Sequence, residues 1–322
     1  MDDYPRSLAE FRARFATDEA CLAYLVACRW PGGFVCPACG GTGGWLMARG
    51  LFLCQACRRQ VSVTSGTIFH QTRLPLRQWF EAMWHLTQQK YGANALGLQR
   101  LLGLGSYHTA WRWLHRLRRA MVRPDRDRLS GQVEVDETYL GGERSGKRGR
   151  GAANKALIVV AVEDTAKPGG KQRGMGRVRL ARIPNASAAT LEAFLRENVA
   201  PGSRVRTDGW LGYAPLAESD YVHEVVGSHE MVITHRVVSL LKRWLMGTYQ
   251  GAVQVQHLDY YLDEYTFRFN RRKAGHRGLL FYRLVQQAVA TAPIRGECLR
   301  GDHAGEHQPT TASSQPQDLG GG

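Results

Sequence analysis

Residues 133–142 read Val-Glu-Val-Asp-Glu-Thr-Tyr-Leu-Gly-Gly, and the interpretation of the whole chain depends on this acidic stretch. Val133 and Val135 alternate with Glu134 and Asp136, which is the period of a strand, and the two glycines end that strand in a turn. A carboxylate at the end of a buried strand is costly unless a charged group meets it, and a divalent metal ion is one such group. Taken alone, the pattern is better explained as an edge strand that happens to carry acidic residues, so the rest of the chain must decide.

The composition of the 322-residue chain bounds its class. Hydrophobic residues make up 43% and charged residues 22%, as in a soluble globular protein of two or three domains. The net charge of +15 indicates a polyanionic partner, with nucleic acid first and an acidic membrane surface second. No apolar run approaches the roughly 18 to 20 residues that span a bilayer, and the N-terminus lacks the order of a signal peptide. We therefore expect a cytoplasmic protein without a membrane partner, associated with the nucleoid when bound to DNA.

Two pairs of cysteines carry a strong metal-binding signal. Cys36-Pro-Ala-Cys39 and Cys54-Gln-Ala-Cys57 are separated by fourteen residues that suit a short hairpin. Each Cys-x-x-Cys places two thiolates on one tight turn, and two such turns complete a tetrahedral Zn²⁺ site. Because four thiolates leave no open position, we predict a structural zinc ribbon rather than a catalytic metal.

Residues 71–123 are interpreted as basic helices that include a helix-turn-helix. Residues 93–102 and 108–121 form two predicted helices around a glycine-containing turn, and the second helix is rich in Arg. An ordinary helical hairpin with a solvated basic face fits this pattern equally well, and the net charge of the chain favours DNA binding. The side chains predicted to contact DNA from the second helix are Arg112, Arg116 and Arg119.

Beyond residue 126 the pattern becomes that of an α/β domain. Three strands, a helix, a strand, a short helix, a strand and a final helix is the order of a ribonuclease H-like fold with a mixed five-stranded sheet. In that order the first and fourth strands are neighbours, so Asp136 and Asp208 are expected to face each other. Paired carboxylates of this kind suit phosphoryl transfer with two Mg²⁺ ions about 3.5–4 Å apart.

Several further motifs follow one another along the chain. They are Arg29-Trp-Pro-Gly-Gly-Phe-Val-Cys-Pro-Ala-Cys-Gly, Gly66-Thr-Ile-Phe-His-Gln-Thr, Thr207-Asp-Gly-Trp, Ser239-Leu-Leu-Lys-Arg-Trp and Phe267-Arg-Phe-Asn-Arg-Arg. Together with residues 133–142, they resemble the zinc-ribbon DDE transposases of bacterial insertion sequences, the ISXO-like group, up to about residue 290. The resemblance implies an enzyme that binds the terminal inverted repeats of its element and then cuts and joins DNA with Mg²⁺ or Mn²⁺. It also implies a homo-oligomer on double-stranded DNA, because two element ends must be brought together.

By the same resemblance, Asp136 is the first catalytic carboxylate and Asp208 the second, and both are expected to bind Mg²⁺. Such enzymes usually begin the next helix with Glu or Asn and carry Lys or Arg seven residues later, about two turns along one face. Lys242 fits the basic member, but the residue seven positions before it is His235. A neutral imidazole binds Mn²⁺, or Mg²⁺ less tightly, or orients water or phosphate. The alternatives are Glu230 as the third ligand and a purely structural histidine.

The predicted organisation completes this interpretation. It comprises N-terminal helices with the ribbon (1–70), the helix-turn-helix segment (71–125), the catalytic domain (126–290) and a disordered tail (291–322). The remaining predicted DNA contacts are Lys147, Arg148, Arg150 and Arg243. The alternative function is a catalytically inactive or domesticated zinc-ribbon DNA-binding protein, such as a regulator, since it would share both the ribbon and the charge.

Overall fold

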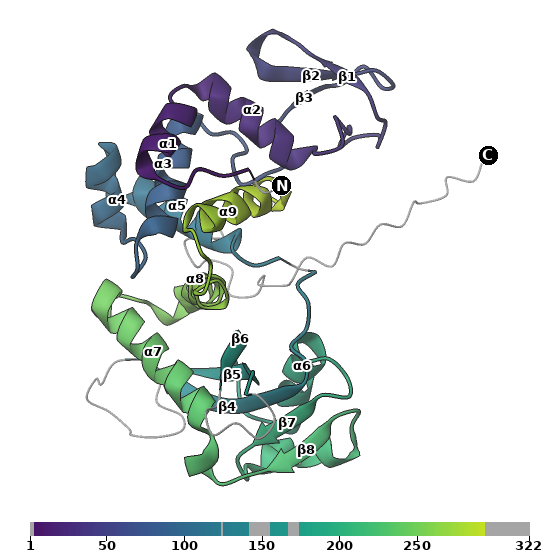
Figure 1. The fold of residues 1–322 in the computed structure, drawn as a ribbon, viewed down its shortest axis with the longest axis vertical. Coiled ribbons are helices and arrows are strands. Elements are labelled where there is room, and N and C mark those ends of the chain that lie inside the picture. Colours follow the sequence, from purple (N-terminus) through teal and green to yellow (C-terminus); the bar gives the residue numbers. More distant parts are fainter. Residues whose placement is uncertain (1–2, 124, 142–154, 167–173, 294–322) are drawn as a thin grey trace, which may run out of the picture.

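The chain folds into two parts stacked along the long axis of the molecule (Figure 1). The first holds the N-terminal helices and a small sheet, and the second holds a larger sheet with its helices. The computed structural model describes residues 3–123, 125–141, 155–166 and 174–293. The predicted contacts Lys147, Arg148 and Arg150 lie outside these residues, as does nearly all of the predicted tail.

The first part begins with two short helices and a three-stranded antiparallel sheet. The helices are α1 (Leu8–Arg14) and α2 (Asp18–Arg29), and the strands are β1 (Gly44–Leu46), β2 (Leu51–Cys54) and β3 (Gln60–Ser62), with the 3₁₀ turn η1 (Ala48–Gly50) after β1. Thr17 caps α2, because its Oγ1 accepts a hydrogen bond from the backbone N–H of Ala20 at 3.2 Å. The pairing of β1 with β2 confirms the hairpin predicted between the two cysteine pairs.

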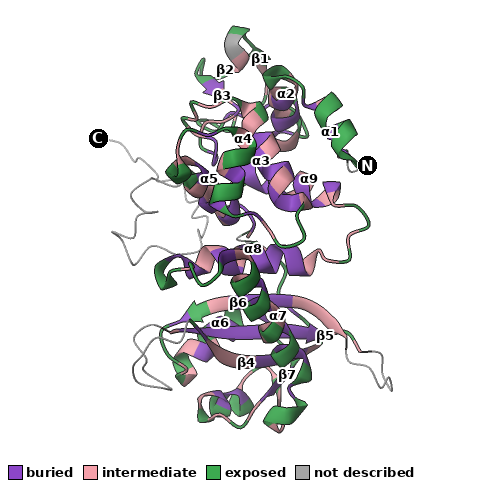
Figure 2. Cartoon of the chain, turned by 90° about the vertical axis from the view of Figure 1, so that its left-hand side faces the viewer, coloured by how far each residue is buried: buried purple, intermediate pink, exposed green. Residues whose placement is uncertain are grey.

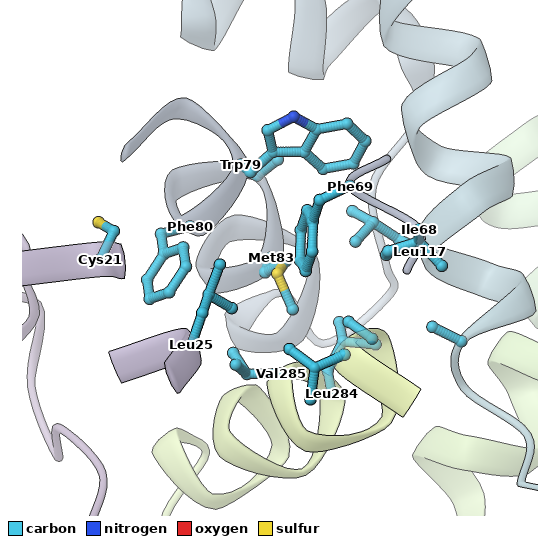
Figure 3. Packing of buried hydrophobic residues seen from close by; sticks show 14 of the residues in the cluster. Cys21, Leu25, Ile68, Phe69, Trp79, Phe80, Met83, Leu117, Leu284 and Val285 are labelled. Atoms are coloured by element: carbon cyan, nitrogen blue, oxygen red, sulfur yellow. The ribbon is translucent and has the colours of Figure 1, made fainter. Parts of the chain in front are cut away.

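Three further helices belong to this part. They are α3 (Leu76–Gln88), α4 (Ala95–Leu102) and α5 (Tyr107–Arg119), and the last two lie where the sequence predicts a pair of helices around a turn. Trp79 of α3 stacks on Trp113 of α5 with ring centroids 3.9 Å apart. Met83 and Phe80, also from α3, pack toward Leu25 of α2 (Figure 3). The apolar face of α3 therefore joins the N-terminal helices to α5.

The last helix, α9 (Gly278–Ala290), packs in this same core, although its residues lie within the range 126–290 predicted for the catalytic domain. Phe281 is fully buried, and its ring meets that of Phe80 edge-on at 5.7 Å. Leu284 and Val285 complete the contact (Figure 3). A helix must bury its apolar face against some layer, but its own pattern does not say which one. The chain thus leaves the N-terminal part and returns to it.

The second part is a mixed five-stranded sheet with the strand order β6-β5-β4-β7-β8. Its strands are β4 (Gln132–Leu140), β5 (Ala156–Asp164), β6 (Met175–Ile183), β7 (Arg204–Thr207) and β8 (Val222–Val225). The first three pair antiparallel, whereas β4 pairs with β7, and β7 with β8, in parallel. This order confirms that the first and fourth strands of the domain are neighbours.

Helices cover both faces of this sheet. One face packs on α6 (Ala188–Asn198) and the 3₁₀ segment η2 (Leu211–Glu218), and the other on α7 (Val232–Tyr249) and α8 (Leu258–Asn270). The shorter 3₁₀ turns η3 (Ser228–Glu230) and η4 (Val255–His257) precede α7 and α8. Eight of the nine residues of β5 are buried, as expected for a central strand covered on both sides.

Helix α8 forms the junction between the two parts (Figure 2). Arg118 of α5 donates a hydrogen bond from Nε to Glu264 of α8 at 2.8 Å, and both side chains are almost completely buried. Arg268 also donates to Glu264 at 2.8 Å and to the backbone of Gln89 at 2.9 Å. A buried carboxylate with two guanidinium partners is satisfied in charge and in hydrogen bonding, so this cluster fixes α5 against α8.

Candidate active site and metal centre

The four cysteines of the small sheet converge as a metal site requires. Their sulfur atoms all lie within 4.8 Å of one another, and the Sγ atoms of Cys36 and Cys57, and of Cys39 and Cys54, are 3.7 Å apart. A tetrahedral site with Zn–S bonds of about 2.3 Å places its sulfurs about 3.8 Å apart. Backbone N–H groups, led by that of Ala38, lower the pKa of Cys36 to about 7, which favours the thiolate. The cluster therefore fits a structural Zn²⁺ ion.

The two cysteine turns share one backbone conformation. The N–H of Gly40 donates to the carbonyl of Cys36 at 2.9 Å, and the N–H of Arg58 donates to that of Cys54 at 3.1 Å. Each donor follows the second cysteine of its pair and has a positive φ, 69° for Gly40 and 59° for Arg58. This left-handed residue closes the tight turn that aims two thiolates at one point.

The two predicted carboxylates lie at the same level of the large sheet. Parallel register pairs Glu134 with Arg206, and continuing it by two residues brings Asp208, directly after β7, level with Asp136. Both aspartates line a cavity of about 780 Å³ that Glu137 and Trp210 also line. The structure therefore brings together two side chains that are seventy-two residues apart in the sequence.

Hydrogen bonds orient both carboxylates. Asp136 Oδ1 accepts the backbone N–H of Glu137 at 2.8 Å, and Asp208 Oδ1 accepts that of Trp210 at 3.1 Å. Burial raises the pKa of Asp136 above its ordinary value, and the negative charge of Asp208 adds to this, while the N–H of Glu137 and His235 oppose it. A cation between the carboxylates would relieve the repulsion, and carboxylate oxygens are hard ligands that suit Mg²⁺ or Mn²⁺.

This second site is more open than the cysteine site. Among the residues that the structure describes, the four cysteines alone bring three or more potential ligand atoms within 4.8 Å of one another. Asp136, Asp208 and His235 are therefore more widely spaced than the ligands of a closed metal centre. Mg²⁺ sites that act on phosphates commonly use one or two carboxylates and leave the remaining positions to water and substrate oxygens.

Helix α7 presents His235 and Lys242 to the same strand. His235 Nε2 lies 3.4 Å from Asp136 Oδ2. Lys242 Nζ donates to Thr138 Oγ1 at 3.2 Å. Because side chains alternate across a strand, Asp136 and Thr138 lie on one face of β4, and α7 runs along that face. The seven-residue spacing thus places an imidazole at the first aspartate and an ammonium group two residues farther along.

Glu230, the alternative third ligand, is engaged elsewhere. Its Oε1 accepts the backbone N–H of Gly227 at 3.2 Å, and its Oε2 lies 3.9 Å from Arg206 Nη2. Of these two candidates, His235 is the one that contacts Asp136.

The sequence interpretation missed the part played by Glu134. This side chain is fully buried, and its Oε2 accepts the backbone N–H groups of Ile233 and Thr234 at 3.0 and 3.1 Å, where α7 begins. Its Oε1 accepts Arg206 Nη1 at 3.4 Å. An anion is favoured at a helix N-terminus, so Glu134 fixes the start of α7 directly before His235. The available signal was a glutamate on the same strand face as Asp136.

The predicted DNA-contacting arginines of α5 are only partly on the surface. Arg112 is exposed, whereas Arg116 and Arg119 are half-buried, and Arg243 is exposed on α7. Burial, followed by the charge of Arg112, lowers the pKa of Arg116. Of the three predicted DNA-contacting arginines of α5, Arg112 is therefore the most accessible to a ligand.

Comparison with known proteins finds two regions of the chain that match transposase domains. Residues 128–270 match the model of the ISXO2-like transposase domain, and residues 16–60 match that of the transposase zinc-ribbon domain. In these two regions the chain is similar to domains of insertion-sequence transposases. It is also 28% identical, over 259 residues, to a Halobacterium salinarum protein described as an uncharacterized protein in the transposable element ISH50. That alignment covers 72% of this chain and 84% of the relative.

The two matched regions contain both candidate sites. The zinc-ribbon match includes the four converging cysteines, and the transposase match includes β4, β7 and α7, with both aspartates and His235. Helix α9 lies beyond both matches, although it packs in the N-terminal core. Within the described residues, no helix combines the length and apolar character needed to cross a membrane.

Proposed function

We propose that the protein is a transposase that binds the terminal inverted repeats of its insertion sequence and catalyses metal-dependent DNA cleavage and strand transfer. The catalytic domain is ribonuclease H-like in this proposal, since its strands follow that order and its first and fourth strands pair in parallel. One observation carries the proposal. Asp136 of β4 and Asp208, directly after the adjacent strand β7, line one cavity, and His235 Nε2 lies 3.4 Å from Asp136 Oδ2.

The residues of this site divide the work between holding metal and placing DNA. Asp136 and Asp208 hold Mg²⁺ or Mn²⁺, and His235 completes the set as the third group. When bound, the metal activates the attacking oxygen and stabilises the leaving one. Lys242, held by Thr138, faces the scissile phosphate or the flanking strand. Catalysis then rests on position and charge rather than on covalent chemistry by the side chains.

The N-terminal part binds DNA in this proposal. The zinc ribbon and the helix-turn-helix formed by α4 and α5 bind the element ends, and basic side chains along the chain contact the DNA backbone. The proposed contacts are Arg112, Arg116, Arg119, Lys147, Arg148, Arg150 and Arg243. The active assembly is a homo-oligomer in the cytoplasm, on the nucleoid, since two double-stranded ends must meet.

The test separates cutting from binding. Asp136→Ala and Asp208→Ala are each expected to abolish joining of terminal-repeat DNA in Mn²⁺ while leaving its binding intact. Asp220→Ala, which changes an exposed aspartate outside the cavity, is the matched control and should keep both activities. If wild-type protein binds the terminal repeats but never cuts them in Mn²⁺ or Mg²⁺, the proposed enzymatic activity is wrong.

The alternative is an inactive or domesticated DNA-binding protein, and the observation that favours it is His235 in a position where a carboxylate or amide is usual. Both functions predict binding to terminal repeats. Only the transposase predicts that binding is followed by cleavage that depends on the two aspartates. Inverted repeats flanking the reading frame in its genome would favour the transposase.

A further inference from the structure

Five arginines surround a second cavity, of about 260 Å³, where the N-terminal part meets the large sheet. They are Arg123 and Arg126 of the segment between α5 and β4, Arg177 and Arg179 of β6, and Arg271, directly after α8. No residue lines both this junction cavity and the cavity around Asp136. The candidate active site therefore does not account for this concentration of positive charge.

One of the five arginines is neutralised by a neighbouring carboxylate. Arg177 Nη2 lies 2.6 Å from Glu163 Oε1, and Arg177 Nε donates to Glu163 Oε2 at 2.9 Å. This is a bidentate pair, the strongest form of such contact. Glu163 is thereby committed to Arg177.

Three of the other four arginines that line the cavity have hydrogen bonds but no such carboxylate partner. Arg179 donates to the backbone carbonyls of Val178 and Asp127, and Arg126 donates to Asn198 Oδ1 at 3.0 Å. Arg271 donates to a backbone carbonyl at 3.3 Å and lies over the ring of Phe267 at 4.1 Å. Within the described part of the chain, none of these three has a carboxylate oxygen within 4.0 Å of its nitrogens.

A backbone carbonyl accepts a hydrogen bond from a guanidinium group but does not neutralise its positive charge. Arg179 is only 4% exposed, and an unpaired buried cation is unfavourable until an anion joins it. Burial, reinforced by Arg126 and Arg177, lowers the pKa of Arg179 to about 9. Burial with Arg123 and Arg283 lowers that of Arg271 to about 10.

The acidic groups nearby do not balance these cations. Asp127 lines the cavity but contacts Arg179 through its carbonyl, and its side chain is exposed. Asp263, which attracts Arg126, does not line the cavity, and burial raises its pKa to about 7. The cavity keeps an excess of positive charge.

We propose that the junction cavity binds a phosphate group. Arginine forks match phosphate oxygens, and the cavity is several times larger than the roughly 30 Å³ of one liquid water. Two sources share this chemistry: a backbone phosphate of bound DNA, and a free phosphorylated solute. The DNA source rests on the proposed function. It suits this cavity because Arg123 and Arg126 line it, and the segment that carries them connects the two parts of the molecule.

The test uses the zinc-loaded full-length protein with Arg126→Gln, Arg271→Gln and the charge-retaining Arg271→Lys. Arg12→Gln, at an exposed position of α1, removes the same charge outside the cavity lining and is the matched control. Binding of terminal-repeat duplex is measured by fluorescence anisotropy over a series of salt concentrations. In parallel, the shift of Tm with sodium phosphate is compared with that in sodium chloride of equal ionic strength.

If the cavity binds a DNA phosphate, each Gln variant binds the duplex about tenfold more weakly than wild type. The slope of log affinity against log salt concentration then falls in magnitude by about 0.9. Arg12→Gln and Arg271→Lys keep the wild-type slope. A free phosphorylated solute predicts unchanged slopes, with a Tm rise in phosphate that wild type shows and both Gln variants lose.

Equal slopes together with no phosphate-specific Tm shift in wild type would overturn the proposal. If Arg271→Gln does not fold, Arg126→Gln and the phosphate titration of wild type still test whether the cavity binds phosphate. Every readout here is binding or stability. A protein that binds DNA without cutting it would therefore contradict the proposed transposase activity but not the phosphate site.

Discussion

The carboxylate of Glu134 holds the first turn of α7 through Thr234, whose backbone N–H and hydroxyl both donate to Glu134 Oε2, at 3.1 and 3.2 Å. The next residue along the helix is His235, which contacts Asp136, two residues after Glu134 on the same strand face. Strand β4 therefore both carries the first aspartate and positions the helix that presents its partner.

The first prediction concerns the contact between Glu134 and the start of α7. Glu134→Ala is expected to lower the free energy of unfolding by about 3–5 kcal/mol, since Arg206 loses a buried counter-charge. Glu134→Gln keeps the shape and should cost about 1–3 kcal/mol. Urea unfolding measures both. Glu192→Gln, which alters a half-buried glutamate of α6 in a surface pair with Arg196, should stay within about 0.5 kcal/mol of wild type. Equal stability of Glu134→Ala and wild type would contradict the positioning role.

The second prediction follows from the raised pKa of Asp136. A carboxyl whose pKa is higher in the folded state disfavours folding once it is ionised, so the penalty is absent below the ordinary aspartate pKa and grows as pH rises through the raised one. In metal-free protein, Asp136→Asn is therefore expected to be more stable than wild type at pH 7, with the difference vanishing near pH 3.

The control for this prediction is Asp220→Asn, at an exposed position. Mn²⁺ should reverse the order of stability, because a ligand at 100 times its Kd stabilises wild type by about 2.7 kcal/mol and Asp136→Asn has lost a ligand. An Mn²⁺ effect of equal size in both proteins would place the metal elsewhere.

The third prediction separates His235 from Glu230. His235→Ala is expected to slow DNA joining by roughly 10²-fold or more, the cost of a misplaced catalytic group. Glu230→Gln should leave the rate nearly unchanged, because that side chain faces Gly227 and Arg206. His235→Glu should shift the preference from Mn²⁺ toward Mg²⁺, since a carboxylate is the harder ligand. Rates are compared in each metal at saturating concentration, and a larger loss for Glu230→Gln would exchange the two roles.

The parts of the fold that could be predicted are those with local or topological signals. Alternating Val and acidic residues predict β4, and the order of strands and helices then places Asp208 beside Asp136. The Cys-x-x-Cys spacing predicts the zinc cluster without any knowledge of the rest of the chain.

The parts that could not be predicted depend on partners far along the chain. Glu134 meets Arg206 across seventy-two residues, and Arg118 meets Glu264 across one hundred and forty-six. Nothing in the arginine-rich pattern of α5 distinguishes Arg118, which points into the core, from Arg112, which is exposed. Helix α9 likewise carries an apolar face that fits either part of the molecule. Buried polar pairs of this kind become visible only after the elements are packed.

The last prediction concerns zinc. The protein should contain one tightly bound Zn²⁺ per chain, and Cys57→Ser should lose it, because a four-thiolate site has no spare ligand. Cys28→Ala is the matched control and should keep its zinc, since Cys28 is half-buried among apolar neighbours of the N-terminal core and is no part of the cluster. Without metal, the small sheet and its hairpin are expected to unfold, because bonds to the ion stabilise the folded ribbon.

The large sheet has its own two cores and should survive loss of the ribbon. Zinc content by atomic absorption, and circular dichroism during a chelator titration, therefore measure a partial transition rather than complete unfolding. Lowering the pH should mimic the chelator, because the thiolates must stay deprotonated to bind. Complete, cooperative unfolding of Cys57→Ser would show instead that the small sheet stabilises the entire chain.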